Sequence, residues 1–363
     1  MKSDIVIIFS DNNGGVKNAS KLLYGAFKEK KIKTDLFNML SNGNNLFSRI
    51  FHTIRYLKKY KSDTIILLMH FDAIFAGFFL SFLGYKKTIN VIHTDLYGYY
   101  KSSGLFKKMI IKLIFIKMRR KKNIFVSKEA ENRAKKYFKL QNSNCIYNIT
   151  QIKLKNRKKI NDNEKTISLG IVSRLHIQKN IDLAIRVVKE LNQLGGSINL
   201  KIYGDGPELE RLKQYVSILN CEDQIFFFGH VDAKDEIFNS FDALISFSSI
   251  EGLPTIILES FIFNKPVYFT DCHTGPRELI LPNTLPEIKT NNFEITQCGF
   301  LVKPTENENK YAFNINEEEI IYVNTLNEFI RNLQGSRFNI NYDFNSISDE
   351  KIISQWQVIF CEI

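Results

Sequence analysis

Short apolar runs alternate along the chain with longer segments in which apolar residues recur every three to four positions. The short runs are rich in β-branched and aromatic residues and predict buried strands, whereas the longer segments predict helices. The predicted strands are 5–9, 65–69, 89–93, 124–127, 167–173, 198–203, 225–229, 243–248 and 266–270. Because strand and helix alternate throughout, the pattern is typical of βαβ units around parallel sheets, and we expect an α/β protein.

The alternation lapses once, in the polar and basic segment 151–165, which has no apolar periodicity. This lapse predicts a domain boundary, and a chain of 363 residues is long enough for two domains of ordinary size. We expect an N-terminal domain at 1–150 and a C-terminal domain at 166–340, the latter with helices at 180–194, 207–219 and 255–263. The last segment, 341–363, has apolar residues at helical spacing and predicts a helix that packs back on the N-terminal domain.

One apolar stretch, 64–85, approaches the length of a membrane span, but His70 and Asp72 interrupt it. A buried strand followed by a buried helix is the preferred interpretation, and a membrane span is the alternative. The apolar run at 5–9 is too short for a signal peptide and is expected to be a strand. Five cysteines are scattered without the spacing of a disulfide framework or a zinc site, which fits a reducing cytosol.

Charge divides the chain into two unlike halves. Residues 1–160 contain 33 Lys and Arg against 9 Asp and Glu, whereas residues 161–363 contain 17 against 29. The strongly basic first half favours an anionic partner, which could be nucleic acid, an anionic membrane or a phosphorylated acceptor. The alternative is a lysine-rich composition without functional meaning, but such a bias does not explain why the sign reverses between the halves.

The segment 251–259, Glu-Gly-Leu-Pro-Thr-Ile-Ile-Leu-Glu, directly follows a predicted strand. Pro254 suits the first position of a helix, so the backbone amides of 252–255 are expected to be unpaired at a helix N-terminus, where a phosphate can bind. Glu251 lies just before this helix and Glu259 about one turn inside it, so both carboxylates can face one cleft and bond sugar hydroxyls. Alternatively, Glu251 caps the helix and Glu259 is a solvated surface residue.

Two further segments follow predicted strands of the second half. Arg174 and Lys179 lie in the loop after strand 167–173, and Arg and Lys are the residues that neutralise a diphosphate. A solvated pair beside a strand end is the alternative. Gly204-Asp-Gly206-Pro-Glu follows the next strand; its glycines allow a tight turn and its proline can start a helix, which is a weak motif by itself.

In this order and spacing, these segments resemble the donor-binding domain of family 4 retaining glycosyltransferases. The resemblance covers residues 166–302 and includes Phe228-Gly-His230, Phe247-Ser248, Lys265-Pro-Val267, Thr274-Gly-Pro-Arg-Glu278 and Gly299-Phe-Leu-Val302. It implies the GT-B architecture, in which two Rossmann-like domains with parallel sheets face each other across a cleft.

The resemblance also implies a role for each matching residue. Arg174 and Lys179 would bind the donor diphosphate and stabilise its charge as it leaves. Glu251 would orient sugar hydroxyls, and Glu259 would bind the ribose diol. The other donor-binding positions would be Gly204 in its turn, His230 and Val231 beside the base, and the backbone of Leu253, Pro254 and Thr255.

The first half resembles the family only in outline. Gly14 and Gly15 follow the first strand, as does the glycine pair whose backbone closes over the diphosphate in the family; a simple turn explains them equally well. His93, at the end of a predicted strand, resembles the family's histidine at the reaction centre, and the alternative is a histidine satisfied by backbone. Asn148 matches the family's interdomain segment.

The segment 101–122 mixes Lys and Arg with apolar residues. Such a mixture predicts a basic amphipathic helix suited to an anionic membrane surface, and a core helix with a solvated basic edge is the alternative. Together with the basic first half, it predicts a cytoplasmic protein that is peripheral on the inner face of the cytoplasmic membrane.

These observations predict a metal-independent glycosyltransferase of the hexosyltransferase type, and the family resemblance implies that it retains the anomeric configuration. Its donor is expected to be a nucleotide-sugar, with UDP preferred over GDP, and its acceptor a saccharide or lipid-linked saccharide of a bacterial polysaccharide, lipopolysaccharide or capsule. We expect no metal, because the chain lacks paired aspartates at alternate positions that would bridge a metal to a diphosphate. We also expect no cofactor and no nucleic acid partner. The alternatives are a nucleotide-sugar epimerase or hydrolase on the same scaffold, and a non-catalytic polyanion-binding protein.

Overall fold

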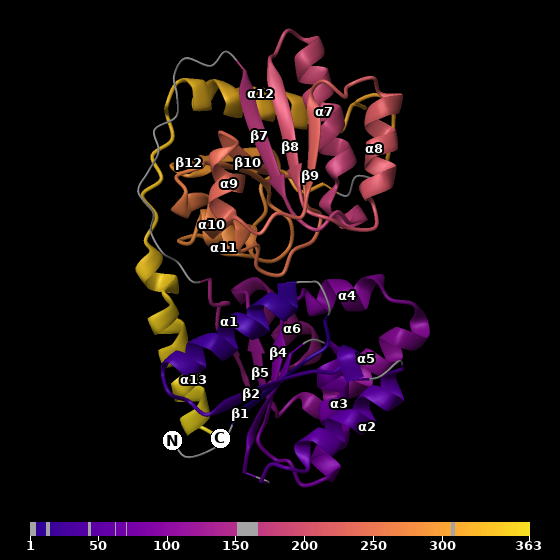
Figure 1. Cartoon of the computed structure of the whole chain (residues 1–363), viewed down its shortest axis with the longest axis vertical. Helices are drawn as coiled ribbons and strands as arrows, with labels where there is room; N and C mark the ends of the chain where they lie inside the picture. Colours follow the sequence, from indigo (N-terminus) through magenta and orange to yellow (C-terminus); the bar gives the residue numbers. More distant parts are fainter. Residues whose placement is uncertain are drawn as a thin grey trace. The chain divides into compact units, whose positions relative to one another are not determined.

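The structure is a computed structural model of the chain and describes residues 5–11, 15–42, 45–61, 63–69, 71–150, 166–305 and 309–363. The chain divides into two compact units: unit 1 comprises Met1–Ile152 with Phe344–Ile363, and unit 2 comprises Lys153–Asp343. The predicted boundary segment 151–165 lies outside the described residues. In each unit, helices pack on a central sheet (Figure 1).

Unit 1 is built on a six-stranded sheet with the order β2-β1-β3-β4-β5-β6, and all neighbouring strands pair in parallel. Its strands are β1 Ile5–Phe9, β2 Thr34–Asn38, β3 Ile65–Met69, β4 Thr88–Ile92, β5 Lys122–Phe125 and β6 Ser143–Cys145. Its helical elements are α1 Gly15–Glu29, η1 Leu40–Asn42, α2 Leu46–Leu57, α3 Phe71–Phe82, α4 Leu96–Ser102, α5 Leu105–Met118, α6 Lys128–Phe138, η3 Phe344–Ile347 and α13 Asp349–Cys361. The hydrophobic pattern predicts the four inner strands and misses the two edge strands, β2 and β6.

Two apolar clusters cover the two faces of the unit 1 sheet, because alternate residues of each strand point to opposite faces. On β1, Val6 and Ile8 join the cluster formed with α2, α3, α5 and α6, whereas Ile5 and Ile7 join the cluster formed with α1 and α13. Trp356 of α13 meets Phe27 of α1 with ring centroids 6.3 Å apart, and the two helices lie side by side (Figure 1). The C-terminal helix is thus part of the unit 1 core.

The apolar stretch at 64–85 forms strand β3 followed by helix α3, which has 12 residues. This is the arrangement preferred from the sequence over a membrane span. Within the part of the chain that the structure describes, no helix combines the length and apolar character needed to cross a membrane.

Unit 2 is built on a seven-stranded sheet with the order β12-β13-β11-β10-β7-β8-β9, in which only β12 runs antiparallel to its neighbour. Its strands are β7 Ile167–Val172, β8 Ile198–Tyr203, β9 Ile225–Gly229, β10 Ala243–Ser246, β11 Val267–Thr270, β12 Phe293–Thr296 and β13 Gly299–Val302. Its helical elements are η2 Ile177–Lys179, α7 Ile181–Gln193, α8 Leu209–Ile218, α9 Lys234–Asn239, α10 Ile256–Ile262, α11 Pro276–Ile280 and α12 Ile320–Gln334. The two mainly parallel sheets confirm the predicted α/β class.

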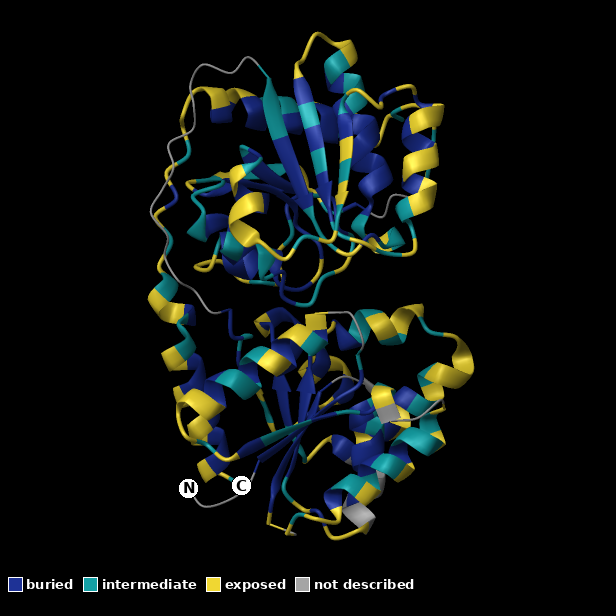
Figure 2. Cartoon of the chain, viewed as in Figure 1, coloured by how far each residue is buried: buried dark blue, intermediate teal, exposed yellow. Residues whose placement is uncertain are grey.

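The inner strands of both sheets are buried and the outward faces of the helices are exposed (Figure 2). In unit 2 the parallel strands end at one edge of the sheet, and the loops that leave β7, β8, β9 and β10 carry most of the predicted site residues. Ligands of open α/β sheets bind outside the carboxyl ends of the strands, so the topology gathers these loops where binding is expected.

Candidate functional site

The loop after β7 presents Lys179 at the end of the 3-10 turn Ile177–Lys179. Its Nζ atom lies 2.5 Å from Oε1 of Glu251, which follows β10. A backbone hydrogen bond joins the two loops, since Ser249 N donates to Gln178 O at 2.9 Å. Only 23% of the Lys179 side chain and 12% of the Glu251 side chain are exposed, so solvent screens this ion pair less than one on an open surface. The structure therefore brings two predicted site residues into direct contact.

Arg174 lies at the start of the same loop, is exposed, and has no hydrogen bond or ion pair with any of the described residues. The next residue, Leu175, is buried and anchors the loop: its N–H donates to Asp205 O at 2.9 Å and its carbonyl oxygen accepts from Glu208 N at 3.2 Å. A guanidinium on an anchored loop can direct its five donors to an anion without first breaking another contact.

Glycine is required in the turn after β8. Gly204 has a φ of +130°, and a Cβ at this position would lie 1.9 Å from Ser173 O. A Cβ at Gly206 would lie 2.2 Å from Leu175 O. Only glycine lets this turn pack against the loop that carries Arg174, so the glycines that form a weak motif in the sequence have a clear steric role.

The loop before α10 differs from the sequence prediction. The helix begins at Ile256 with Thr255 as its N-cap, so Pro254 precedes the helix and does not occupy its first position. Pro254 has no N–H, and the Thr255 N–H donates to Leu253 O at 2.9 Å, so neither backbone position can donate to a phosphate. The amides of Gly252, Leu253 and Ile256 have no acceptor among the described residues. The amide donors available to an anion are therefore fewer than predicted.

A second segment of unit 2 supports this loop from behind. The Thr274 hydroxyl donates to the carbonyl oxygen of Glu251. Gly275 has a φ of +98°, and a Cβ there would lie 2.5 Å from Cδ of Pro254. The segment 274–278, which is part of the family resemblance, thus holds the Glu251 loop in place. It does not itself add a free charge to the site.

Glu259 lies in the first turn of α10, and its Oε1 is 2.9 Å from Nζ of Lys234 on α9. The sequence gives no local signal for Lys234, because the pairing depends on how α9 and α10 pack. His230 follows β9 and is exposed, with its Nε2 atom 3.1 Å from Oδ1 of Asp232. Val231 is half-buried beside it. These positions line the same edge of the sheet as Lys179.

Unit 1 carries the other predicted site residues. Gly14 lies outside the described residues. Gly15 begins α1; neither packing nor a left-handed φ requires glycine there, since a Cβ would meet no atom within 4 Å. The Asp11 carboxylate caps α1 by accepting from Lys17 N at 3.1 Å. His93 directly follows β4 and is half-buried.

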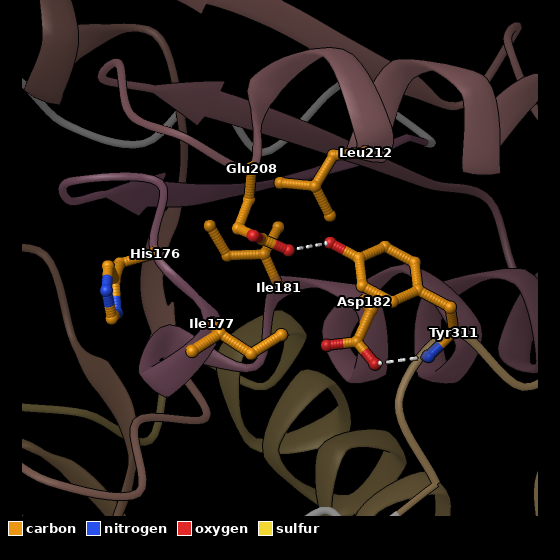
Figure 3. Close-up of a pocket in the computed structure, with 7 residues that line it drawn as sticks. All are labelled: His176, Ile177, Ile181, Asp182, Glu208, Leu212 and Tyr311. Atoms are coloured by element: carbon orange, nitrogen blue, oxygen red, sulfur yellow. Dashed lines mark hydrogen bonds between the residues drawn. The ribbon is translucent and has the colours of Figure 1, made fainter.

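A small pocket lies beside the turn that presents Lys179, and Figure 3 shows its lining residues, His176, Ile177, Ile181, Asp182, Glu208, Leu212 and Tyr311. The Tyr311 hydroxyl donates to the Glu208 carboxylate, and the Tyr311 N–H donates to Oδ2 of Asp182 at 3.0 Å. Sequence reasoning missed Tyr311 and its neighbour Lys310, because no motif marks them and they lie far along the chain from the loops they contact.

The site is suited to anions. Its possible anion donors are the Arg174 guanidinium, the Lys179 ammonium group and backbone amides, while the carboxylates of Glu251 and Glu259 are each paired with a lysine. No group of three or more His, Cys, Asp or Glu side chains in the described ranges is arranged to hold a metal ion. Cys272 is fully buried, and burial together with the Glu251 charge raises the pKa of its thiol well above the usual value, so the thiol stays neutral.

Comparison with known proteins gives one family and several relatives. The model of a family described as "Glycosyl transferases group 1" matches residues 152–331. A poly(ribitol-phosphate) alpha-N-acetylglucosaminyltransferase of Staphylococcus aureus is 25% identical over 68% of this chain and 49% of its own length. A lipopolysaccharide 1,6-galactosyltransferase of Salmonella typhimurium is 29% identical over 33% of this chain and 34% of its own length. The chain therefore spans half or less of these curated relatives.

The solved structure of Anabaena HepE in complex with UDP-glucose is similar to this chain with a TM-score of 0.73. The similarity covers 99% of this chain and 100% of that protein, at 16% sequence identity. An identity this low shows a shared fold and nothing of the activity.

Proposed function

Through residues 152–331 the chain belongs to the glycosyl transferases group 1 family, and it has the GT-B fold; from this premise we propose that it is a retaining glycosyltransferase. It transfers a sugar from a UDP-sugar to a saccharide or lipid-linked saccharide acceptor. One observation carries the proposal: the Lys179–Glu251 ion pair, the Arg174 guanidinium and the amides of Gly252 and Leu253 belong to loops at one edge of the unit 2 sheet. Among the described residues, neither this guanidinium nor these amides have a hydrogen-bond partner.

The cations act on the leaving group in this proposal. Negative charge grows on the diphosphate as its bond to the sugar breaks, and Arg174 and Lys179 stabilise that charge. Lys179 holds the Glu251 carboxylate, which accepts hydrogen bonds from the sugar hydroxyls, and Glu259 binds the ribose diol. Because two protein cations meet the diphosphate, the proposed reaction proceeds without a metal.

The acceptor hydroxyl attacks from the face that the diphosphate leaves, so the anomeric configuration is retained. A phosphate oxygen of the donor accepts the hydroxyl proton, and neither Glu251 nor Glu259 acts as a nucleophile. His93 of unit 1 is the proposed histidine of the reaction centre, and Gly15 is proposed to approach the diphosphate through its backbone.

The named relatives support the choice of donor and pathway. HepE was solved with UDP-glucose, and the Staphylococcus and Salmonella relatives are named for the transfer of N-acetylglucosamine and galactose. We therefore propose a UDP-hexose type of donor and an acceptor in the synthesis of a bacterial surface polysaccharide, lipopolysaccharide or capsule.

We further propose that unit 1 meets an anionic membrane through helix α5. Five apolar side chains of this helix are more than half exposed: Leu105, Phe106, Met109, Leu113 and Ile116. At 3.6 residues per turn they lie within about 100° of the helix circumference and form one stripe. The opposite face packs into the core through Ile111, Ile114, Phe115 and Met118. Helix α5 is thus a core helix with a second apolar face that is exposed.

Basic and aromatic residues flank this apolar stripe. Lys112 is exposed on the same helix, and Nζ of Lys107 lies 4.5 Å from the ring centroid of Tyr99. Exposed apolar side chains bordered by lysines and tyrosines suit the interface of a membrane that contains anionic lipids. The enzyme would then act on the inner face of the cytoplasmic membrane, where a lipid-linked acceptor is accessible.

A vesicle experiment tests the membrane proposal. The protein is sedimented with phosphatidylglycerol-containing vesicles at low and high salt. We expect the double variant Met109→Glu, Leu113→Glu to lose most binding at both salt concentrations, because it removes the inserted apolar surface. Val358→Glu, which charges an exposed apolar position of α13, should bind as wild type does. Undiminished vesicle binding by the double variant would rule out the α5 stripe as the membrane-binding surface.

The transfer reaction itself separates the proposed function from its alternatives. The purified protein is incubated with a panel of UDP-sugars and a lipid extract that contains lipid-linked saccharides, without added metal. We expect UDP release together with a sugar attached to the acceptor in the retained configuration, measured by mass spectrometry and NMR. Release of free sugar would identify the protein as a hydrolase, and an epimerised nucleotide-sugar would identify it as an epimerase. Salt-sensitive RNA binding without nucleotide-sugar binding would identify the polyanion-binding protein.

A further inference from the structure

We propose that Lys310 positions the loop that carries Arg174 and Lys179, and that Tyr311 joins this loop to the turn after β8. Both act through other residues and not by touching the donor. Their effect on donor binding rests on the proposed function, whereas their positioning role rests on contacts within unit 2 alone.

Lys310 holds both ends of the turn that presents Lys179. Its Nζ atom donates to Ile177 O at 3.1 Å and to the side-chain oxygen of Asn180. Asn180 is buried, has the left-handed backbone angles φ 49° and ψ 41°, and donates from Nδ2 to Phe247 O at 2.7 Å. One ammonium group therefore connects the turn, its left-handed end and the loop that leaves β10.

Tyr311 makes the second set of connections. Its N–H bonds to Asp182 at the start of α7, and its hydroxyl bonds to Glu208, the residue before α8 (Figure 3). The guanidinium of Arg211 lies 4.0 Å from the centre of its ring. Because Glu208 N in turn bonds to Leu175 O, Tyr311 reaches the Arg174 loop through the turn that contains Gly204.

The surroundings of Lys310 disfavour a charged side chain that makes no hydrogen bonds. Burial lowers the pKa of its ammonium group, which means that desolvation opposes the charged form. The carboxylates of Asp182, Glu208 and Glu319 counteract this effect, and Arg186 adds to it. Charged side chains are rarely buried unless they are paired, and here the ammonium group also satisfies two acceptors of the Lys179 turn.

Removing the ammonium group should release the turn. Ile177 O and the Asn180 amide oxygen would each lose a charged donor, and the left-handed conformation of Asn180 would lose its support. A hydrogen bond to a charged group changes an equilibrium constant by about tenfold or more. We therefore expect about a tenfold loss of UDP affinity when the turn no longer holds Lys179 in place.

Three variants test the positioning role. Lys310→Met keeps the aliphatic stem without the donor, and Lys310→Arg restores a cationic donor. Lys303→Met is the control, because Lys303 is an exposed lysine of the same segment. Hydrogen exchange of peptides covering 174–180 is measured without ligand, and the dissociation constant of UDP is measured by calorimetry.

We expect faster exchange at 174–180 and about tenfold weaker UDP binding in Lys310→Met, with both restored in Lys310→Arg and unchanged in Lys303→Met. Exchange at 174–180 that stays as slow in Lys310→Met as in wild type would overturn the positioning role. Failure of the wild type to bind UDP would contradict the proposed function instead, and the exchange measurement would still decide the role of Lys310.

Discussion

Replacing Lys179 with Met tests the ion pair at the centre of the site. Its Nζ lies 2.5 Å from Oε1 of Glu251, whose side chain is 12% exposed. A hydrogen bond between charged groups contributes about 1.5–3 kcal/mol, and because Lys179 is 23% exposed we take the lower end, about 1.5 kcal/mol. In a domain of this size, that loss lowers the melting temperature by about 3–6 °C. Met replaces the aliphatic stem of the lysine with an unbranched chain of the same four-atom length, so the change reports the lost ammonium charge and not a large cavity.

A double-mutant cycle separates the ion pair from other effects of the substitution. Lys179→Met leaves Glu251 without its cation, whereas adding Glu251→Gln removes the stranded charge, so the double variant should recover about 1 kcal/mol of the summed losses. Unfolding is followed by calorimetry and by circular dichroism in urea.

The exposed pair Lys213 and Glu210 serves as the reference for this cycle. These side chains are 3.0 Å apart but 49% and 76% exposed, so their coupling should stay below about 0.5 kcal/mol. Coupling between Lys179 and Glu251 that is no larger than this reference would refute the structural description of the site.

Three other predictions concern the same unit and the chain's thiols. Gly204→Ala should destabilise unit 2 by about 2–4 kcal/mol in urea unfolding, because its Cβ would meet a backbone oxygen at a φ of +130°. Glu259→Ala should weaken UDP binding, and Arg174→Ala should chiefly slow transfer; unchanged binding and rate in both would remove them from the site. Burial raises the pKa of Cys221 to about 11, so the neutral thiol persists at pH 8. Cys221 should therefore react with a thiol reagent only on unfolding, whereas exposed Cys361 reacts in the folded protein.

The alternation of apolar runs was sufficient to predict the four inner strands of unit 1 and the five strands β7 to β11 of unit 2. It missed β12 and the buried inner strand β13, which has only four residues and begins with a glycine. The edge strands β2 and β6 carry polar residues such as Asp35 and Asn144, and they escaped the same reasoning. The predicted helix at 255–263 began one residue before α10, and the placement of Pro254 at its first position was wrong. Pro254 is compatible with a first helical position, but the bond from Thr255 N to Leu253 O forms a tighter turn before the helix.

Local motifs predicted Lys179 and Glu251, since each lies in a loop that follows a strand, but no motif predicted the contacts that distant segments make with this site. Lys234 reaches Glu259 because two helices pack together, and Lys310 reaches the Lys179 turn across 130 residues of sequence. Periodicity could not say which apolar face of α5 is covered, because coverage depends on the neighbouring helices. Contacts between distant segments are set by packing and are not visible in local spacing.

The most direct test of the central claim is the binding of UDP- and GDP-sugars to the full chain in the presence of EDTA, with wild type compared with Lys179→Met. The account predicts that the wild type binds a UDP-sugar without metal and that Lys179→Met weakens this binding by about tenfold or more, because a charge-assisted contact to the diphosphate is lost. Equal binding by the two proteins would contradict the placement of the donor site, and failure of every donor to bind the wild type would contradict the proposed function.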